Sequence, residues 1–336
     1  MGNRECVLVA GGAGFIGSHV CKRLAGAGFQ PVVYDNLSRG YKSSVKWGPL
    51  EIGDIADRVR VREVLNQYHP IAVMHFSAFI NVGESVNNPL LYYSNNAGST
   101  AIFLQSIVEH GILPFIFSST AAVYGLPDAI PIDEDHPHRP INAYGSSKLH
   151  VEHMLGDANK AHGLPWVALR YFNAAGSDPD GEIGEKHEPE THLIPLVLRA
   201  ALTGTPVSIF GDDYDTPDGT CVRDYIHVND LADAHILALK YLLGGGKSCG
   251  MNLANSQGFS VREVIATAER VCGHPIAVKV APRRPGDPPF LIGKAERAKT
   301  LLGWAPTRSD LEMQVRDAWN WLKTHRRATV SQNIDQ

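Results

Sequence analysis

The feature that most constrains the fold is a glycine-rich stretch that follows a short apolar run near the N-terminus. The run Val7–Ala10 predicts a buried parallel strand, and Gly11, Gly14 and Gly17 follow it before helical periodicity resumes. A strand, a tight turn and a helix N-terminus in this order cradle a pyrophosphate. The first glycine permits the turn, the second lets backbone approach phosphate, and the third lets the helix pack closely on the strand. The stretch therefore predicts a dinucleotide-binding unit.

An acidic residue closes the next apolar run. Val32–Tyr34 predicts a second strand, and Asp35 ends it about 20 residues after the glycines, where a ribose-binding acid is expected. A carboxylate there accepts hydrogen bonds from a 2′-hydroxyl and repels a 2′-phosphate. We therefore expect the cofactor to be NAD rather than NADP, and Arg39 is the one nearby residue that favours NADP.

Strand and helix patterns alternate through the first half of the chain. This alternation predicts an α/β fold with a doubly wound parallel sheet of Rossmann type and a site at the carboxyl ends of its strands. The expected strands span residues 7–10, 32–34, 50–54, 71–76, 115–119 and 166–170, and the expected helices span residues 58–68, 90–110 and 143–162.

The character of the sequence changes after Asn173. Residues 174–192 are polar, rich in glycine, proline and acids, and too long for a simple connection, which is typical of a lid or a binding segment. We expect residues 1–173 to form an NAD-binding Rossmann domain. Residues 174–330 are expected to form mainly a smaller C-terminal α/β substrate-binding cap, with some segments returning to the nucleotide domain. Its expected elements are a short element at 207–210 and helices at 229–243, 260–272, 295–302 and 310–323.

The composition excludes several classes of partner. A net charge of −4 over 336 residues gives no basic surface for nucleic acid or anionic lipid. No apolar run approaches the roughly 20 residues that span a bilayer, and the first strand leaves no room for a signal peptide, so we expect a cytoplasmic protein. The five cysteines lack metal spacing, and the Asp212–Asp215 run is typical of a solvated turn. We therefore expect no metal.

Candidate catalytic groups lie at the start of one predicted helix and at the end of one predicted strand. Tyr144 and Lys148 share a helical face, and an ammonium beside a phenol lowers the phenol pKa from about 10. Such a phenolate can take a proton from a substrate hydroxyl while hydride leaves the same carbon. Thr120 is placed to hydrogen-bond the reacting oxygen. Ser118 is expected in a solvated turn, and His75 is expected in the core.

Together these residues resemble the extended short-chain dehydrogenase/reductase superfamily and, within it, the UDP-glucose 4-epimerase family. The resemblance covers nearly the whole chain and is far more specific than any single motif. The stretches that carry it are Gly11–His19, Asp35–Leu37, Gly53–Ile55, His75–Phe76, Val82–Ser85, Ser118–Gly125, Tyr144–Lys148, Leu169–Asn173, Asp218–Thr220, Val222–Val228 and Arg284–Asp287.

The resemblance implies a reversible inversion at C4 of a UDP-sugar, with UDP-galactose and UDP-glucose interconverted through a transient 4-keto sugar and bound NADH. It implies that Tyr144 takes the O4 proton, that Thr120 relays it, and that Lys148 assists. It also implies a homodimer, formed by the helices that start near Leu90 and Ala143.

The implied cofactor contacts are Gly11, Gly14, Phe15, Ile16, Gly17, Asp35, Asn36, Asp54, Ile55, Phe76, Asn95, Lys148 and Phe172. The implied substrate contacts are Thr120, Tyr144, Asn173, His192, Ile209, Phe210, Arg223, Arg284, Asp287 and Leu291.

Departures from the family pattern leave alternative activities open. Leu291 stands where several relatives carry Tyr, so a UDP-N-acetylhexosamine 4-epimerase is one alternative. Ala10, Ile80 and His192 are further departures, and a UDP-arabinose/UDP-xylose 4-epimerase is the nearest competing activity.

The residues around the predicted catalytic groups favour or disfavour other activities that occur on the same fold. Dehydratases and decarboxylases are disfavoured, because Ala121 and Ala122 stand where those enzymes need a carboxylate. A net oxidoreductase that releases NADH at each turnover is a further enzyme alternative. A non-catalytic NAD- or UDP-sugar-binding protein is the alternative of another class, and the intact Thr120, Tyr144 and Lys148 set disfavours it.

Overall fold

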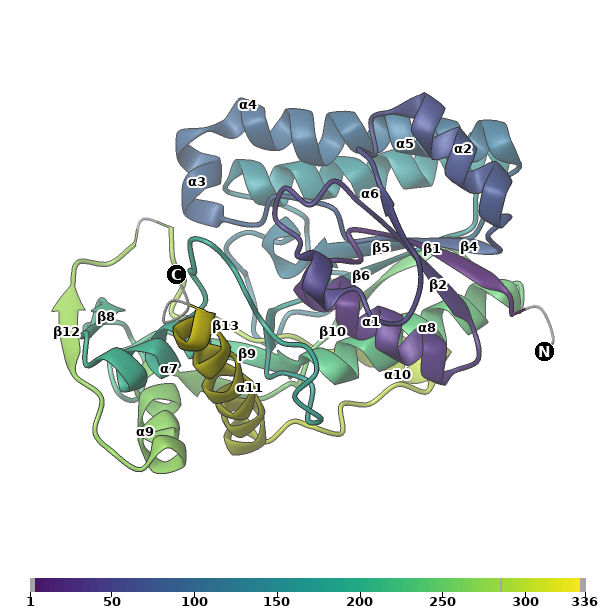
Figure 1. The fold of residues 1–336 in the computed structure, drawn as a ribbon. Coiled ribbons are helices and arrows are strands. Elements are labelled where there is room, and N and C mark those ends of the chain that lie inside the picture. Colours follow the sequence, from purple (N-terminus) through teal and green to yellow (C-terminus); the bar gives the residue numbers. More distant parts are fainter. Residues whose placement is uncertain (1–3, 285, 333–336) are drawn as a thin grey trace.

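A seven-stranded parallel sheet forms the centre of the larger part of the molecule (Figure 1). The computed structural model describes residues 4–284 and 286–332. The strand order is β10-β6-β5-β4-β1-β2-β3, so the chain winds outward from β1 in both directions. The strands are β1 (Cys6–Ala10), β2 (Gln30–Asp35), β3 (Leu50–Ile52), β4 (Ala72–His75), β5 (Phe115–Thr120), β6 (Trp166–Tyr171) and β10 (Cys249–Leu253).

Helices cover both faces of this sheet, which confirms the doubly wound α/β prediction. One face packs against α1 (Phe15–Gly26), α8 (Val228–Leu243) and α10 (Glu296–Leu302), and the other against α2 (Arg58–Tyr68), α5 (Ser99–His110) and α6 (Ala143–His162) (Figure 1). The helix that was expected over residues 90–110 is divided. It comprises α4 (Pro89–Tyr92), a π-helical turn (Tyr93–Gly98) and α5, and α3 (Val82–Asn87) precedes it.

A smaller α/β region lies beside the carboxyl ends of the large sheet. Its core contains Val197, Ile209, Val264 and Val315, which are all buried. Its strands are β7 (Asn173–Ala175), β8 (Val207–Phe210), β9 (Val222–His227), β11 (Gly258–Ser260), β12 (Val278–Ala281) and β13 (Phe290–Leu291). Its helices are α7 (Leu193–Thr203), α9 (Val261–Cys272) and α11 (Leu311–Gln332).

Segments of the second half of the chain return to the large sheet. Strand β10 pairs in parallel with β6, and α8 packs against α1. Strand β9 pairs with β7, which continues directly from β6, so the two parts share a continuous backbone path. The sequence analysis did not predict α7, β9, β10 or β12.

A buried polar network fixes α6 against the strands beneath it. Arg170 on β6 pairs with Glu152 on α6 at 2.5 Å, and Ser119 on β5 donates to the same carboxylate at 2.6 Å. Arg170 also donates to the Tyr124 hydroxyl at 2.9 Å, and that hydroxyl donates to Asn252 on β10. A buried charge pair with all these partners ties four elements into one arrangement.

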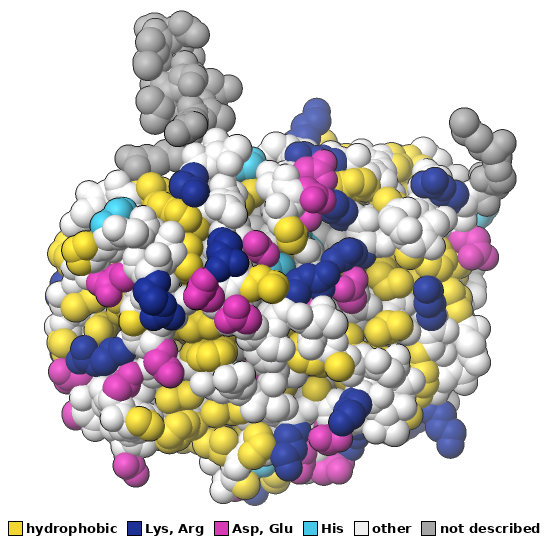
Figure 2. Space-filling model, turned by 90° about the horizontal axis from the view of Figure 1, so that it is seen from below, with side chains coloured by type: hydrophobic (Ala, Val, Ile, Leu, Met, Phe, Trp, Pro, Cys, Tyr) yellow, Lys and Arg dark blue, Asp and Glu magenta, His cyan; other side chains and the backbone are white. Residues whose placement is uncertain are grey.

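The surface is mixed in charge on the face that Figure 2 shows, where Lys and Arg side chains are interspersed with Asp and Glu. Among the described residues, no helix is both long and apolar enough to cross a membrane.

Candidate active site

The glycine turn between β1 and α1 has the shape of a phosphate cradle. Gly11 has φ +80°, and a Cβ there would lie 2.5 Å from the backbone nitrogen of Ser77. A Cβ at Gly17 would lie 2.4 Å from the carbonyl oxygen of Gly11, whereas one at Gly14 would meet that oxygen only at 3.4 Å. No side chain caps the N-terminus of α1. The first N–H groups of α1, which begins with Phe15 and Ile16, are therefore available to an anion, so these residues fit the pyrophosphate of NAD.

Asp35 is buried against this turn at the end of β2. Its carboxylate accepts the N–H of Ala13 at 3.0 Å and the N–H of Leu37 at 2.8 Å. Burial raises the pKa of Asp35, and these two hydrogen bonds oppose the rise. Arg39 donates to the carbonyl oxygen of Glu188 at 3.1 Å. Its guanidinium is therefore hydrogen-bonded to the polar segment of residues 176–192, which follows β7. This geometry favours NAD over NADP.

The other predicted cofactor contacts surround the same strand ends. Asn36 donates to Asp54 at 2.9 Å, and Ile55 is buried directly after it. The backbone N–H of Phe76 donates to Ala10 at the end of β1. Two predicted contacts lie farther along the chain: Asn95 lies in the π-helical turn, and Phe172 packs beside Ala121 at the end of β5.

Thr120, Tyr144 and Lys148 converge where β5 ends and α6 begins. Lys148 is 2 % exposed, and its ammonium donates to the Ser118 carbonyl oxygen at 2.8 Å and lies 4.8 Å from the centre of the Phe117 ring. Thr120 accepts the N–H of Ala122 at 3.1 Å, and its side chain lies close enough to the Tyr144 hydroxyl to lower the Tyr144 pKa. The structure thus brings the three predicted catalytic residues together.

The predicted direction for the Tyr144 pKa is wrong in this structure. Burial raises the pKa of Tyr144, and the nearby Thr120 side chain opposes that rise only in part. Burial also lowers the pKa of Lys148 to about 7, while the Glu152 carboxylate opposes that fall. Because its own pKa falls to about 7, Lys148 is only partly protonated near neutral pH, so it does not supply the full positive field that we expected at the phenol.

The structure contradicts the prediction for Ser118 and confirms the prediction for His75. Ser118 is buried, and its hydroxyl is hydrogen-bonded to Tyr171, so the expectation of a solvated turn is wrong. His75 is buried 2.9 Å from the Thr100 hydroxyl, which confirms its place in the core.

Most predicted substrate residues gather on the smaller region. Arg223 pairs with Asp287 at 2.6 Å, and the Arg284 guanidinium stacks 4.0 Å from the centre of the Phe210 ring. A Cβ built on Gly286 would lie 3.3 Å from Ile141, so this loop reaches the start of α6. Residue 285, between Arg284 and Gly286, lies outside the described residues.

The side chains of the remaining predicted substrate residues differ in their surroundings. Asn173 donates to the carbonyl oxygen of Asp224 at 2.9 Å, and Leu291 packs on the same apolar cluster as Phe172. Ile209 is 1 % exposed inside the core of the smaller region, so only its backbone is left for a ligand. His192 lies at the entry to α7, with its ring directed at Glu185.

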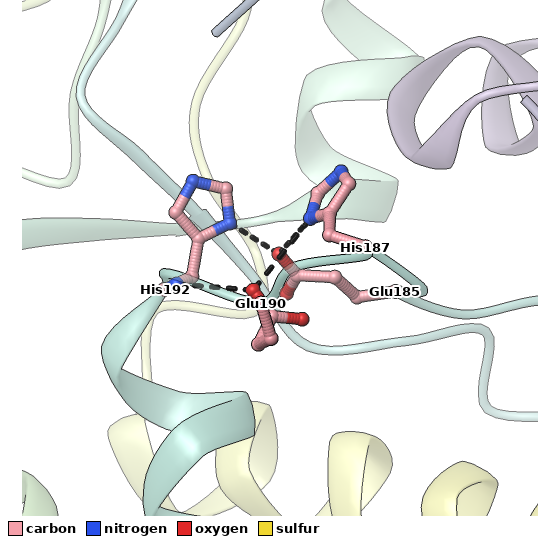
Figure 3. A group of neighbouring side chains, drawn as sticks. All are labelled: Glu185, His187, Glu190 and His192. Carbon is pink, nitrogen blue, oxygen red and sulfur yellow. Dashed lines mark hydrogen bonds and ion pairs between the residues drawn. The ribbon is translucent and has the colours of Figure 1, made fainter. Parts of the chain in front are cut away.

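The sequence analysis missed a group of side chains around His192. Glu185, His187, Glu190 and His192 converge in the segment that precedes α7 (Figure 3). Nδ1 of His187 lies 3.2 Å from Glu185 and 3.7 Å from Glu190, and Nδ1 of His192 contacts Glu185. The alternation of Glu and His over eight positions was the available signal.

A second missed residue is Asn96, which is buried beside α6. Its side chain donates to the Phe79 carbonyl oxygen at 3.0 Å and to the Ser147 hydroxyl at 3.1 Å, so it fixes the π-helical turn. Such turns are frequent at functional sites.

Comparisons with known proteins agree with this geometry. Residues 7–254 match the model of the NAD dependent epimerase/dehydratase family. The chain is 52% identical to a UDP-glucose 4-epimerase of Rhizobium meliloti, over 94% of this chain and 96% of that protein. Two solved structures are similar in fold. The Brucella ovis UDP-glucose 4-epimerase in complex with NAD is 50% identical, with a TM-score of 0.92 over 94% of this chain and 98% of that one. A Stenotrophomonas maltophila UDP-glucose 4-epimerase with bound NAD and formylated UDP-arabinopyranose is 38% identical, with a TM-score of 0.93 over 97% and 100% of the two chains.

Proposed function

The chain belongs to the NAD dependent epimerase/dehydratase family, and on that premise we propose that it is a UDP-glucose 4-epimerase that interconverts UDP-galactose and UDP-glucose. The observation that carries the proposal is the convergence of Thr120, Tyr144 and Lys148 at the strand ends, beside a glycine turn that fits NAD. A dehydratase or decarboxylase is not favoured, because Ala121 and Ala122 follow Thr120.

Tyr144 is the acid and base of the proposed reaction. When bound, NAD would accept the C4 hydride and later return it to the opposite face of C4, and its positive charge would favour the Tyr144 phenolate. Tyr144 removes the proton from O4, and the Thr120 hydroxyl holds the reacting oxygen and relays that proton. Lys148 holds the start of α6 on β5 through the Ser118 carbonyl. After the 4-keto sugar has turned about its anchored diphosphate, Tyr144 returns the proton to O4.

The proposed ligand contacts are the ones that the family resemblance implies. For NAD they are Gly11, Gly14, Phe15, Ile16, Gly17, Asp35, Asn36, Asp54, Ile55, Phe76, Asn95, Lys148 and Phe172. For the UDP-sugar they are Thr120, Tyr144, Asn173, His192, the backbone of Ile209, Phe210, Arg223, Arg284, Asp287 and Leu291. Arg223 and Arg284 present guanidinium groups, which suit a diphosphate.

A wider sugar range is a second candidate function, and Leu291 supports it. Leu291 packs beside Phe172 on the apolar cluster at the end of β5. A leucine there leaves more space near the reacting sugar than a tyrosine, so we propose turnover of UDP-N-acetylhexosamines in addition to UDP-hexoses.

We also propose that the enzyme is a homodimer formed through the helices that follow Leu90 and Ala143. Leu90, Leu91 and Tyr93 are 80%, 43% and 36% exposed, so an apolar strip lies open there. Light scattering on the wild-type protein and on Leu90→Glu tests this: we expect a dimer that the substitution dissociates, and a wild-type monomer contradicts the proposal.

The experiment that tests the activity is a proton NMR time course of the purified protein with UDP-galactose and no added cofactor. We expect the UDP-glucose anomeric signal to appear without accumulation of NADH. Turnover of UDP-xylose alone would change the assignment to a pentose epimerase. Silence on every sugar nucleotide, with NAD added, would favour a binding protein.

A further inference from the structure

The four side chains of Figure 3 have no role in the proposed reaction apart from the substrate contact of His192. We propose that Glu185, His187, Glu190 and His192, hereafter the 185–192 cluster, bind one divalent transition-metal ion, and that Zn²⁺ is the ion that suits them best. This site does not depend on the proposed activity. It departs from the sequence expectation of no metal, which considered the cysteines and the Asp212–Asp215 run.

The donor set is the first observation. The cluster offers one ligand atom from each residue, and these atoms all lie within 4.8 Å of one another. Two imidazole nitrogens and two carboxylate oxygens suit Zn²⁺, which is commonly four-coordinate with such ligands. The atoms come from one short segment, and both rings turn their Nδ1 atoms towards Glu185 (Figure 3).

The incomplete hydrogen bonding of two buried atoms is the second observation. Oε2 of Glu190 is buried and forms no hydrogen bond, and Nδ1 of His187 is buried with only the Glu185 and Glu190 carboxylates nearby, at 3.2 and 3.7 Å. The Glu190 side chain is 1 % exposed, and the guanidinium of Arg199 approaches its Oε2 only at 3.9 Å. Buried polar atoms are nearly always hydrogen-bonded, so each exception calls for an explanation such as an ion.

Charge is the third observation. The buried carboxylates of Glu185 and Glu190 bring two negative charges into a small volume. One divalent cation balances them and leaves both imidazoles neutral, as metal ligation requires. The competing arrangement has both histidines protonated and no ion, and the experiment below separates the two.

A neighbouring group of three carboxylates already has a cationic partner within the chain. Asp178, Asp180 and Glu182 surround the ammonium of Lys22, at 2.8, 2.7 and 2.6 Å. Lys22 fills the position that a cation would take, so no metal is inferred there. The contact ties the beginning of the 176–192 segment to α1.

The 185–192 cluster lies at the C-terminal end of residues 176–192. An ion bound there would hold this end of the segment against the glycine turn between β1 and α1. The His187 ring meets the edge of Phe15, the first residue of α1, with ring centres 6.4 Å apart. Arg39 holds the Glu188 carbonyl between the two Glu–His pairs. We therefore infer that the ion slows the release of bound NAD.

The test uses the full-length protein without a histidine tag, dialysed against a chelator and then titrated with ZnSO₄ or CoCl₂ alone. We expect one Zn²⁺ per chain by calorimetry and elemental analysis, and the visible absorption of a tetrahedral Co²⁺ site. Glu185→Gln and His187→Gln should each weaken Zn²⁺ binding by at least about tenfold. The matched controls are His274→Gln, an exposed histidine elsewhere, and Asp180→Asn in the Lys22 group; both should bind Zn²⁺ as the wild type does.

Three outcomes would overturn the proposal. They are no stoichiometric Zn²⁺ in the wild type, unchanged binding in the Glu185→Gln/His187→Gln double variant, or no tetrahedral Co²⁺ spectrum. The Co²⁺ spectrum is recorded on the wild type, so it decides the matter even if a variant folds poorly. The retention of NAD during gel filtration, with and without Zn²⁺, tests the fastening role, and equal loss of NAD would remove that role.

Discussion

The ammonium of Lys148 donates to the carbonyl oxygen of Ser118 at 2.8 Å. Tyr144 lies one helical turn before Lys148, and Thr120 lies two residues after Ser118 on β5. This one hydrogen bond therefore joins the helix that carries the proposed base to the strand that carries the proposed relay. We therefore expect Lys148 to influence catalysis through the position of Tyr144 as well as through charge.

Removal of the Tyr144 hydroxyl should abolish most of the turnover. General acid–base catalysis contributes typically about 10²–10⁴-fold, so we expect Tyr144→Phe to lower kcat by at least about 100-fold. The NMR assay with UDP-galactose measures this, and the NAD content should stay unchanged. Tyr241→Phe is the control, because its hydroxyl bonds only the Lys247 carbonyl near the surface. Turnover within tenfold of the wild type would remove Tyr144 from the mechanism.

Lys148 should impose a pH dependence on stability. Burial lowers its pKa from 10.5 to about 7 in the folded protein. Between these values the unfolded chain binds the proton and the folded chain does not, so the free energy of unfolding rises with pH, by at most about 1.4 kcal/mol per pH unit. Lys148→Met should lose this rise.

Urea unfolding of both proteins from about pH 7 to about pH 9 checks the prediction for Lys148. The wild type should gain stability relative to the variant as the pH rises. Parallel curves would show that the ammonium stays protonated in the fold.

Alanine substitutions at two glycines of the turn between β1 and α1 should have different effects, one on stability and the other on NAD binding. A Cβ at Gly17 would lie 2.4 Å from the Gly11 carbonyl oxygen, so Gly17→Ala should destabilise the fold by roughly 1–3 kcal/mol, as overpacking does. A Cβ at Gly14 meets only ordinary contact, and its φ is −81°. Gly14→Ala should therefore fold normally and bind NAD at least about tenfold more weakly. Thermal unfolding and NAD titration check both, and unchanged NAD affinity in Gly14→Ala would contradict the assignment.

Two adjacent arginines should differ in their effect on the substrate. Arg284 stacks on Phe210 beside the Arg223–Asp287 pair, whereas Arg283 pairs with Asp213 at 2.7 Å. Loss of a charge-assisted hydrogen bond to a diphosphate costs about 1.5–3 kcal/mol, so Arg284→Ala should weaken UDP binding by about tenfold or more. Arg283→Ala should change it by less than about threefold. Calorimetry with UDP compares the two, and equal effects would contradict the placement of Arg284.

The size of residue 291 should set the sugar range. We expect Leu291→Tyr to lower kcat/KM for UDP-N-acetylgalactosamine by at least about tenfold and to spare UDP-galactose, because a ring there fills the space for the acetamido group. Leu291→Met, which conserves volume, is the control. No turnover of UDP-N-acetylgalactosamine by the wild type would end the hypothesis.

Local patterns were sufficient for much of the larger sheet. The helices at 58–68 and 143–162 have the predicted bounds, because their amphipathic faces and end signals are strong. Strand β10 escaped prediction because Gly250 and Asn252 have low strand propensity, and it forms by pairing with β6. The π-helical turn at Tyr93–Gly98 also has no local signal, since Asn96 fixes it by hydrogen bonds to distant residues.

The sequence by itself determined the glycine turn, Asp35 and the Tyr144–Lys148 spacing, because each depends on residues close together in the chain. The tertiary structure decided the environment of these groups. It buried Lys148 and partly buried Tyr144, which set the directions of their pKa shifts, and it closed the Ile209 side chain into a core. It also brought Arg284 onto Phe210 across a long sequence separation, and it turned Glu185, His187, Glu190 and His192 towards one point. Burial and convergence depend on packing between distant segments, and no local pattern encodes them.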